Sequence, residues 1–282
     1  MDEQAIAVMG ARLANRAYLF RVFHIIFGAE PSAEELRVLS DQSTLQALAY
    51  LRDQGLPDSG SAAICGAADT AEPTAAGSAA EAAEADPAAT APAAAETLMQ
   101  TLELLVAFGG KLEDAEYIDS LKSVYTRLFL VPGVSYVYPW ESPYVGTTAV
   151  IFTKSTLDVR NRYREHGFTA LEYPHFPEDH VAMMLDFLAH LSNRAFDAFV
   201  DGDDAELMQV LAAQNQFISK HLTNWLGLFQ EELDAQDRSG LYSLFTRALR
   251  VFLELDGLFL QDALSNQGQI DALSSAAEKN AQ

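Results

Sequence analysis

The chain has 282 residues, of which 49% are hydrophobic and 10% aromatic, enough to bury a sizeable core in one or two domains. Forty acidic residues against eighteen basic ones give a formal net charge of −22. This charge argues against nucleic acid or an anionic membrane as the main partner, because phosphate binding requires patches of Lys and Arg, and it favours a basic partner.

Cysteine usage and hydropathy indicate a soluble, cytoplasmic protein. Cys65 is the only cysteine, so no disulfide or thiolate metal cluster can form within the chain. The opening MDEQAIAVMG lacks the basic and then apolar layout of a secretory signal. No apolar run reaches the roughly 18 to 20 residues of a spanning helix. Even YLFRVFHIIFG contains Arg21 and His24, so we expect no direct membrane insertion.

The first part of the chain predicts helices and then a disordered insertion. Residues 5–28 form a long apolar stretch at helical spacing, and Ser32 with Glu35 predicts a capping box at the start of the next helix. From residue 58 to 95 roughly half of the residues are Ala and aromatics are absent, while Pro73, Pro87 and Pro92 interrupt any long helix. We predict a disordered surface linker there, rather than a binding tail.

The rest of the chain also predicts helices. Residues 96–110 carry apolar positions at helical spacing and stop at a Gly pair, and residues 114–133 stop at Pro-Gly. An aromatic and proline-rich segment follows, VPGVSYVYPWESPYVG, after which helical patterns return in residues 147–167, 176–191, 203–236 and 240–264. Gly167 suits a left-handed cap.

No alternating strand pattern competes with these helices. The predicted fold class is therefore all-α, a single-domain helical bundle of about ten helices with one disordered Ala-rich insertion. We place N-terminal helices of the bundle in residues 1–57, the insertion in 58–95, the main core in 96–267 and a flexible tail in 268–282.

The stretch FPEDHVAMMLDFLAHL places charged residues at the mouth of a helix. Pro177 suits the first helical position, and Glu178 and Asp179 would then lie in the first turn, where carboxylates favour the positive end of the helix dipole. His180 begins a stripe that continues through Met184, Phe187 and Leu191, so its imidazole should lie above the core. A histidine in that position suits either a structural hydrogen bond or contact with a ligand.

Two blocks of sequence resemble the TorD/DmsD/NarJ family of redox-enzyme maturation chaperones. The first is Pro-x-Asp-His, followed by VAMMLDFLAHL. The second lies upstream, where VYTRLFLVPG and YPWESPY are similar to the family's Tyr-x-x-Leu-Phe and aromatic-Glu-Ser segments. The C-terminal HLTNWLGLFQEEL and LYSLFTRALRVFLELD are similar to the family's last helices. The resemblance covers the chain apart from residues 58–95 and the tail.

The resemblance implies a cytoplasmic, non-enzymatic chaperone that binds the twin-arginine leader, and the apo form, of a molybdopterin-dependent catalytic subunit of the dimethyl-sulfoxide-reductase type. A leader joins two arginines to an apolar stretch, so its receptor needs carboxylates beside an apolar groove. Asp179 and His180 are the first candidates for leader contact. The residues expected to line or shape the same region are Glu178, Tyr125, Phe129, Trp140, Glu141, Ser142, Tyr144 and Met184. For the aromatic ones, ordinary packing is an equal alternative.

Other functional hypotheses remain open on the sequence alone. One is an assembly chaperone for a cytoplasm-facing subunit of the nitrate-reductase type that has no leader, and another is a helical adaptor for a folded protein. A metalloenzyme built on His175, Glu178, His180 and His190 lacks the H-E-x-x-H pattern. We expect no cofactor. FGGKLED lacks the spacing of a phosphate-binding P-loop, which argues against a nucleotide site of that type. Binding of guanine nucleotide or molybdopterin is otherwise left open. The family resemblance leaves a monomer or a helix-swapped dimer.

Overall fold

The computed structural model describes residues 3–54, 91–146, 151–169 and 177–280. Within them the chain forms eleven α-helices and one π-helical turn and no strand, which confirms the predicted all-α fold. In chain order the elements are α1 (Glu3–Gly28), α2 (Ala33–Leu39), α3 (Gln42–Gln54), α4 (Ala91–Gly109), α5 (Ala115–Tyr125), the π turn η1 (Thr126–Leu130), α6 (Ser142–Val145), α7 (Lys154–Glu165), α8 (Val181–Asp201), α9 (Asp204–His221), α10 (Leu226–Gln236) and α11 (Leu241–Asn280).

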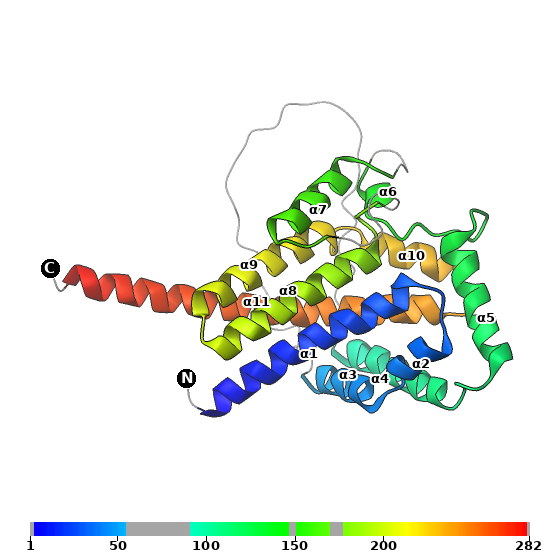
Figure 1. Cartoon of the computed structure of the whole chain (residues 1–282), viewed down its shortest axis with the longest axis horizontal. Coiled ribbons are helices and arrows are strands. Elements are labelled where there is room, and N and C mark those ends of the chain that lie inside the picture. Colours follow the sequence, from blue (N-terminus) through cyan, green and yellow to red (C-terminus); the bar gives the residue numbers. More distant parts are fainter. Residues whose placement is uncertain (1–2, 55–90, 147–150, 170–176, 281–282) are drawn as a thin grey trace.

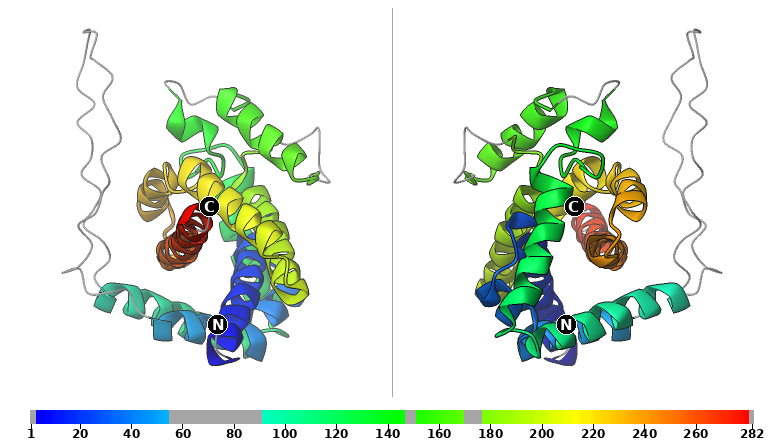
Figure 2. Two further views of the ribbon diagram at one scale, coloured as in Figure 1. Left: turned by 90° about the vertical axis from the view of Figure 1, so that its left-hand side faces the viewer. Right: turned by 90° about the vertical axis from the view of Figure 1, so that its right-hand side faces the viewer.

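Four long helices, α1, α8, α9 and α11, form the body of the bundle (Figure 1). The most extensive packing is between α1 and α8, and α8 also packs on α9. Helices α3 and α4 lie on one side of this body and α7 on the opposite side, while α5 runs across one end (Figures 1 and 2). None of the described helices is long and apolar enough to cross a membrane.

Aromatic side chains fill the centre of the bundle. The rings of Phe20 and Phe23 of α1 pack on Phe252 of α11 with centroids 4.8 and 5.8 Å apart. These side chains belong to one continuous buried cluster that draws on every long helix. Burying large apolar side chains stabilises the fold by roughly 1.5–3 kcal/mol each before chain entropy is subtracted, so this cluster defines one folding unit.

The local helix signals form as predicted. The Ser32 hydroxyl accepts from the backbone N–H of Glu35 at 3.2 Å, and the Glu35 carboxylate accepts from Ser32 N–H at 2.8 Å, so the capping box is complete. Gly167 follows α7 with a φ of +69°, in the left-handed region that favours glycine.

Two helices extend beyond their predicted boundaries. Helix α4 begins at Ala91, inside the predicted insertion of residues 58–95; residues 55–90 of that prediction lie outside the described residues. Pro92 does not interrupt α4 because it lies in the first turn, where a missing N–H costs no hydrogen bond, and Ala94 is buried one turn before Leu98. At the other end, α11 remains helical through Asn280, where a tail was expected from residue 268.

The segment 203–236, predicted as one helix, is divided into α9 and α10. Helix α9 ends at His221, and the fully buried Trp225 donates its indole N–H to the His221 carbonyl at 2.7 Å. That carbonyl is left free at a helix end, so the indole supplies the partner that a continued helix would have provided.

Candidate functional site

The two sequence blocks meet in space. The segment 139–145, which includes α6, lies against residues 177–181 at the start of α8, and we call this contact the α6–α8 junction. Backbone hydrogen bonds join Glu141 N–H to the Asp179 carbonyl at 3.0 Å and Val181 N–H to the Pro139 carbonyl at 2.9 Å. Trp140 and His180 form an isolated antiparallel bridge between these bonds. Segments about 40 residues apart in the chain therefore form one structural unit.

Asp179 fastens the junction through its side chain. Its carboxylate has no exposed surface and accepts from Ser142 N–H at 2.8 Å and from the Ser142 hydroxyl. Burial raises the pKa of Asp179 above its ordinary value, and the hydrogen bonds from Ser142 oppose part of that rise. Asp179 is thus an internal acceptor in this closed arrangement.

Glu178 connects the junction to α7. Its buried carboxylate receives two hydrogen bonds from the Arg160 guanidinium, one of them 2.9 Å from Arg160 Nη2 to Glu178 Oε2. The Tyr163 hydroxyl donates to the Glu178 backbone carbonyl at 2.9 Å. This two-pronged geometry is the arrangement in which an arginine recognises a carboxylate most strongly.

Glu141 is the third buried carboxylate. One oxygen lies 3.0 Å from His221 Nδ1, and the other accepts from the Asn224 side-chain amide at 3.1 Å. The opposite ring nitrogen of His221 lies 3.1 Å from Asp158 at the edge of the junction. The side chain of Asp158 is about one-third exposed and pairs with Lys220.

His180 is the N-cap of α8. Its Nδ1 accepts from Ala182 N–H at 3.1 Å, and its ring stands edge-on to Trp140 with centroids 5.1 Å apart. Burial, with a smaller contribution from nearby His24, lowers the pKa of His180 to about 4, so the ring is neutral near pH 7. Met184 lies buried below it, as the predicted stripe required.

The predicted start of α8 is wrong. The helix begins at Val181, so Pro177 is not its first residue, and Glu178 and Asp179 precede the first turn. The reason is that Asp179 offers both its carbonyl and its carboxylate to the segment 139–145, which holds this part of the chain out of the helix.

The aromatic candidates form a chain of rings inside the bundle. Buried Tyr125 packs on Phe129 at 5.2 Å and donates its hydroxyl to the Phe27 carbonyl, and burial raises the pKa of Tyr125 to about 12. Phe129 contacts Phe229, whose ring also lies 6.2 Å from that of Tyr144. Tyr144 is only partly buried, stacks on Trp225 and donates to Glu232 at 2.8 Å.

Eight of the ten predicted site residues are buried, and His180 and Tyr144 are partly exposed. The junction thus differs from the open, acidic helix mouth that was expected, because each of its carboxylates already has an internal partner. The sequence interpretation missed those partners, which are Arg160, His221, Asn224 and Glu232. Three of them lie in HLTNWLGLFQEEL, whose likeness to the family's last helices was the available signal.

Within the described part of the chain, no group of three or more His, Cys, Asp or Glu side chains is arranged to hold a metal ion. His175, which the metalloenzyme alternative required, lies outside the described residues. The chemistry that the junction offers is hydrogen bonding and charge pairing.

Comparison of the sequence with known proteins places this helical bundle in a class of maturation chaperones. The family described as nitrate reductase delta subunit matches residues 84–231. The chaperone protein TorD of Vibrio cholerae is 32% identical over 162 residues, which is 57% of this chain and 72% of that protein. The TorD proteins of Photobacterium profundum and Vibrio parahaemolyticus are 31% and 26% identical over 148 and 166 residues, covering 52% and 58% of this chain and 66% and 76% of theirs.

The chain therefore belongs to the TorD/DmsD/NarJ family of redox-enzyme (molybdoenzyme) maturation chaperones, and the predicted resemblance is confirmed. It is a chaperone and not an enzyme. Members of this family have catalytic subunits of molybdoenzymes as partners.

Proposed function

We propose that this protein is a cytoplasmic, system-specific chaperone that binds the twin-arginine leader, and the apo form, of a dimethyl-sulfoxide-reductase-type catalytic subunit until its cofactor is inserted. The observation that carries the proposal is the Asp179–Ser142 contact, through which the two family-like blocks close on each other. A receptor for a basic, partly apolar peptide needs carboxylates next to apolar and aromatic side chains, and the junction contains both.

In this proposal a leader arginine replaces the arginine of this chain that already pairs with a junction carboxylate. Glu178 already holds one guanidinium, that of Arg160, so a leader arginine can take the same two-pronged position. Movement of the segment 139–145 away from residues 177–181 would also expose Asp179 and Glu141. The formal charge of −22 attracts the basic leader over a long range.

Trp140 supports an opening of this kind. Its indole Nε1 is buried and makes no hydrogen bond to any of the described residues. A buried donor without a partner costs roughly 1–3 kcal/mol, so a leader carbonyl that reaches this nitrogen would recover part of the cost of opening the junction.

Isothermal titration calorimetry tests the proposal with the leader peptide of the molybdoenzyme encoded nearest to this gene. We expect a micromolar or lower Kd for wild type, and at least a tenfold weaker one for Asp179→Ala, for His180→Ala and for a leader with both arginines changed to alanine. Asp197→Asn removes an exposed carboxylate from α8, the helix that follows Asp179 and His180, and is the matched control. Circular dichroism verifies that each variant is folded.

A second function is favoured by the description of the matched family, nitrate reductase delta subunit. This alternative is an assembly chaperone that recognises the folded part of its catalytic subunit and no leader. It predicts no heat with any leader peptide while the full-length precursor still binds, and that result would leave Asp179 and His180 with structural roles only.

A further inference from the structure

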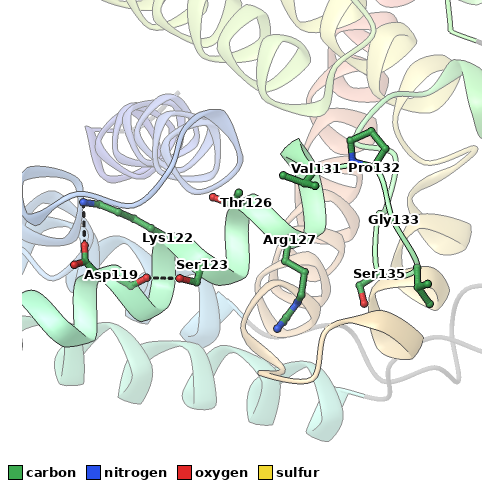
Figure 3. A pocket seen from close by; sticks show the side chains of 10 residues that line it. Asp119, Lys122, Ser123, Thr126, Arg127, Val131, Pro132, Gly133 and Ser135 are labelled. Carbon is green, nitrogen blue, oxygen red and sulfur yellow. Dashed lines mark hydrogen bonds and ion pairs between the residues drawn. The ribbon is translucent and has the colours of Figure 1, made fainter.

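A groove lies on the outer surface of the segment that leads into the junction. It encloses about 630 Å³ between the C-terminal end of α5, the π turn and residues 131–135 (Figure 3). We call it the Arg127 groove, and its lining includes Lys122, Arg127, Val131, Pro132, Val134 and Ser135.

The groove is a basic site on a strongly acidic protein. Lys122 and Arg127 line it together with one carboxylate, that of Asp119, in a chain with a formal charge of −22. Lys122 is 3.4 Å from Asp119, a weak surface pair. The exposed Arg127 guanidinium makes no hydrogen bond or ion pair with any residue that the structure describes. Forty acidic residues are available in the chain, and the fold brings none of the described ones to this arginine.

Apolar side chains stand next to these cations. Val134 is 94% exposed and Val131 is 55% exposed, and Pro132 lies between them. In the described residues, the backbone N–H groups of Gly133, Val134 and Ser135 make no backbone hydrogen bond. Exposed apolar side chains beside free backbone donors and a free cation are the features of a surface that binds an extended peptide.

Hydrogen bonds and core packing hold the residues of the groove in place. Val131 N–H donates to the Thr126 carbonyl at 3.0 Å, which closes the π turn, and Val137 N–H donates to the Leu128 carbonyl at 2.8 Å. The Thr126 hydroxyl bonds Glu30 beyond the end of α1. The inner face of the same turn buries Leu128 and Phe129 in the core, so the groove does not need to be ordered by its partner.

We propose that the Arg127 groove docks an acidic and apolar segment of the mature part of the client catalytic subunit, a second contact separate from the leader. This inference rests on the proposed function. The leader is excluded because its arginines would be repelled by Arg127 and Lys122. An extended segment with a carboxylate near apolar side chains pairs with Arg127 and covers Val131 and Val134 together. A small phosphate compound would leave both valines exposed to water.

The test measures binding of the full-length chaperone to two separate probes. One is the leaderless apo catalytic subunit encoded nearest to this gene, and the other is its leader peptide. We expect Arg127→Glu to weaken binding of the leaderless subunit by about tenfold or more and to leave leader binding within about twofold of wild type. Val134→Ser should weaken the leaderless subunit severalfold. The matched controls are Arg37→Glu, also an exposed arginine on a helix, and Val106→Ser, 58% exposed on α4.

The outcomes separate this proposal from the proposed function. A docking role for the groove is excluded if Arg127→Glu and Val134→Ser bind the leaderless subunit as wild type does. It is also excluded if wild type binds only the leader. It is also excluded if inorganic phosphate binds at Arg127 with high affinity while neither variant affects the client. If the leader produces no heat but the leaderless subunit binds in an Arg127-dependent way, docking at the groove is supported and leader binding is contradicted.

Discussion

His180 is a titratable residue in a position that requires its neutral form. It caps α8 through Nδ1, which must lack a proton to accept from Ala182 N–H, and its ring packs on Trp140. A charged ring would lose this cap and would lie near His24, whose Nδ1 is 2.9 Å from the Ala182 carbonyl. The cap, the ring contact and the lowered pKa therefore all favour one protonation state.

This arrangement predicts a pH dependence of stability. The pKa of His180 is about 4 in the folded protein against an ordinary value of 6.5, so the unfolded chain binds more protons between these values. The stabilisation is present above about pH 6.5 and is lost as the pH falls through about 4. In urea titrations we expect His180→Asn, which retains a capping oxygen, to reduce the difference in unfolding free energy between pH 7 and pH 4.5 by roughly 1–2 kcal/mol.

His24 and Asp179 are present in both proteins of that comparison. The raised pKa of Asp179 acts in the opposite sense, since it favours the folded state on acidification, and it therefore cancels when the two curves are subtracted. Equal pH dependence in wild type and His180→Asn would show that His180 is not held neutral by the fold.

At the scale of elements, α7 depends on its contact with the junction. Arg160 holds Glu178, and Tyr163 donates to the Glu178 carbonyl, so one loop residue secures two successive turns of α7. The Arg160 side chain is about one-quarter exposed and Glu178 is buried, so the pair is partly protected from solvent. Partial burial makes the loss of either partner more costly than the loss of a surface ion pair.

We expect Glu178→Ala to destabilise the protein by about 2–4 kcal/mol, because it removes a buried carboxylate that accepts two hydrogen bonds from Arg160. Hydrogen exchange followed by mass spectrometry should show faster exchange in α7 (Lys154–Glu165) than in α1 or the middle of α8. Glu165→Ala removes a carboxylate that pairs with Arg162 on the surface of the same helix and should change exchange little. Uniformly faster exchange in all helices would contradict this local role.

At the scale of the whole molecule, a buried polar network joins helices that are distant in sequence. Arg16 of α1 makes two hydrogen bonds to Asp256 of α11, one of them 3.0 Å long, and a third to Gln214 of α9 at 3.1 Å. Gln214 in turn donates to the Ser192 hydroxyl of α8 at 2.6 Å. All four side chains are buried, so the four long helices share one polar network.

We expect Arg16→Met to cost about 3–5 kcal/mol, because Asp256 is then a buried charge without its partner. The double variant Arg16→Met with Asp256→Leu removes both charges and should recover at least about 1 kcal/mol of that loss, as measured by urea unfolding at pH 7. A double variant less stable than Arg16→Met would instead show that the ion pair itself is not the cause of the loss.

The sequence by itself determined the all-α fold class, several helix ends and the family. Helical spacing, the Ser32 capping box and Gly167 are local signals, because each acts through residues within one or two turns. The motif around Asp179 and the motif around Trp140 could also be identified from the sequence, since the residues of each motif are close together in the chain.

Only the tertiary structure decided where α8 begins, where α9 ends and which partner each carboxylate has. Asp179 leaves the helix because Ser142 binds it, and Trp225 caps His221 once both are buried in the core. Arg127, on the π turn, has no carboxylate partner among the residues that the structure describes. These outcomes depend on contacts between segments that are distant in sequence, and packing against a common core, not local spacing, selects those contacts.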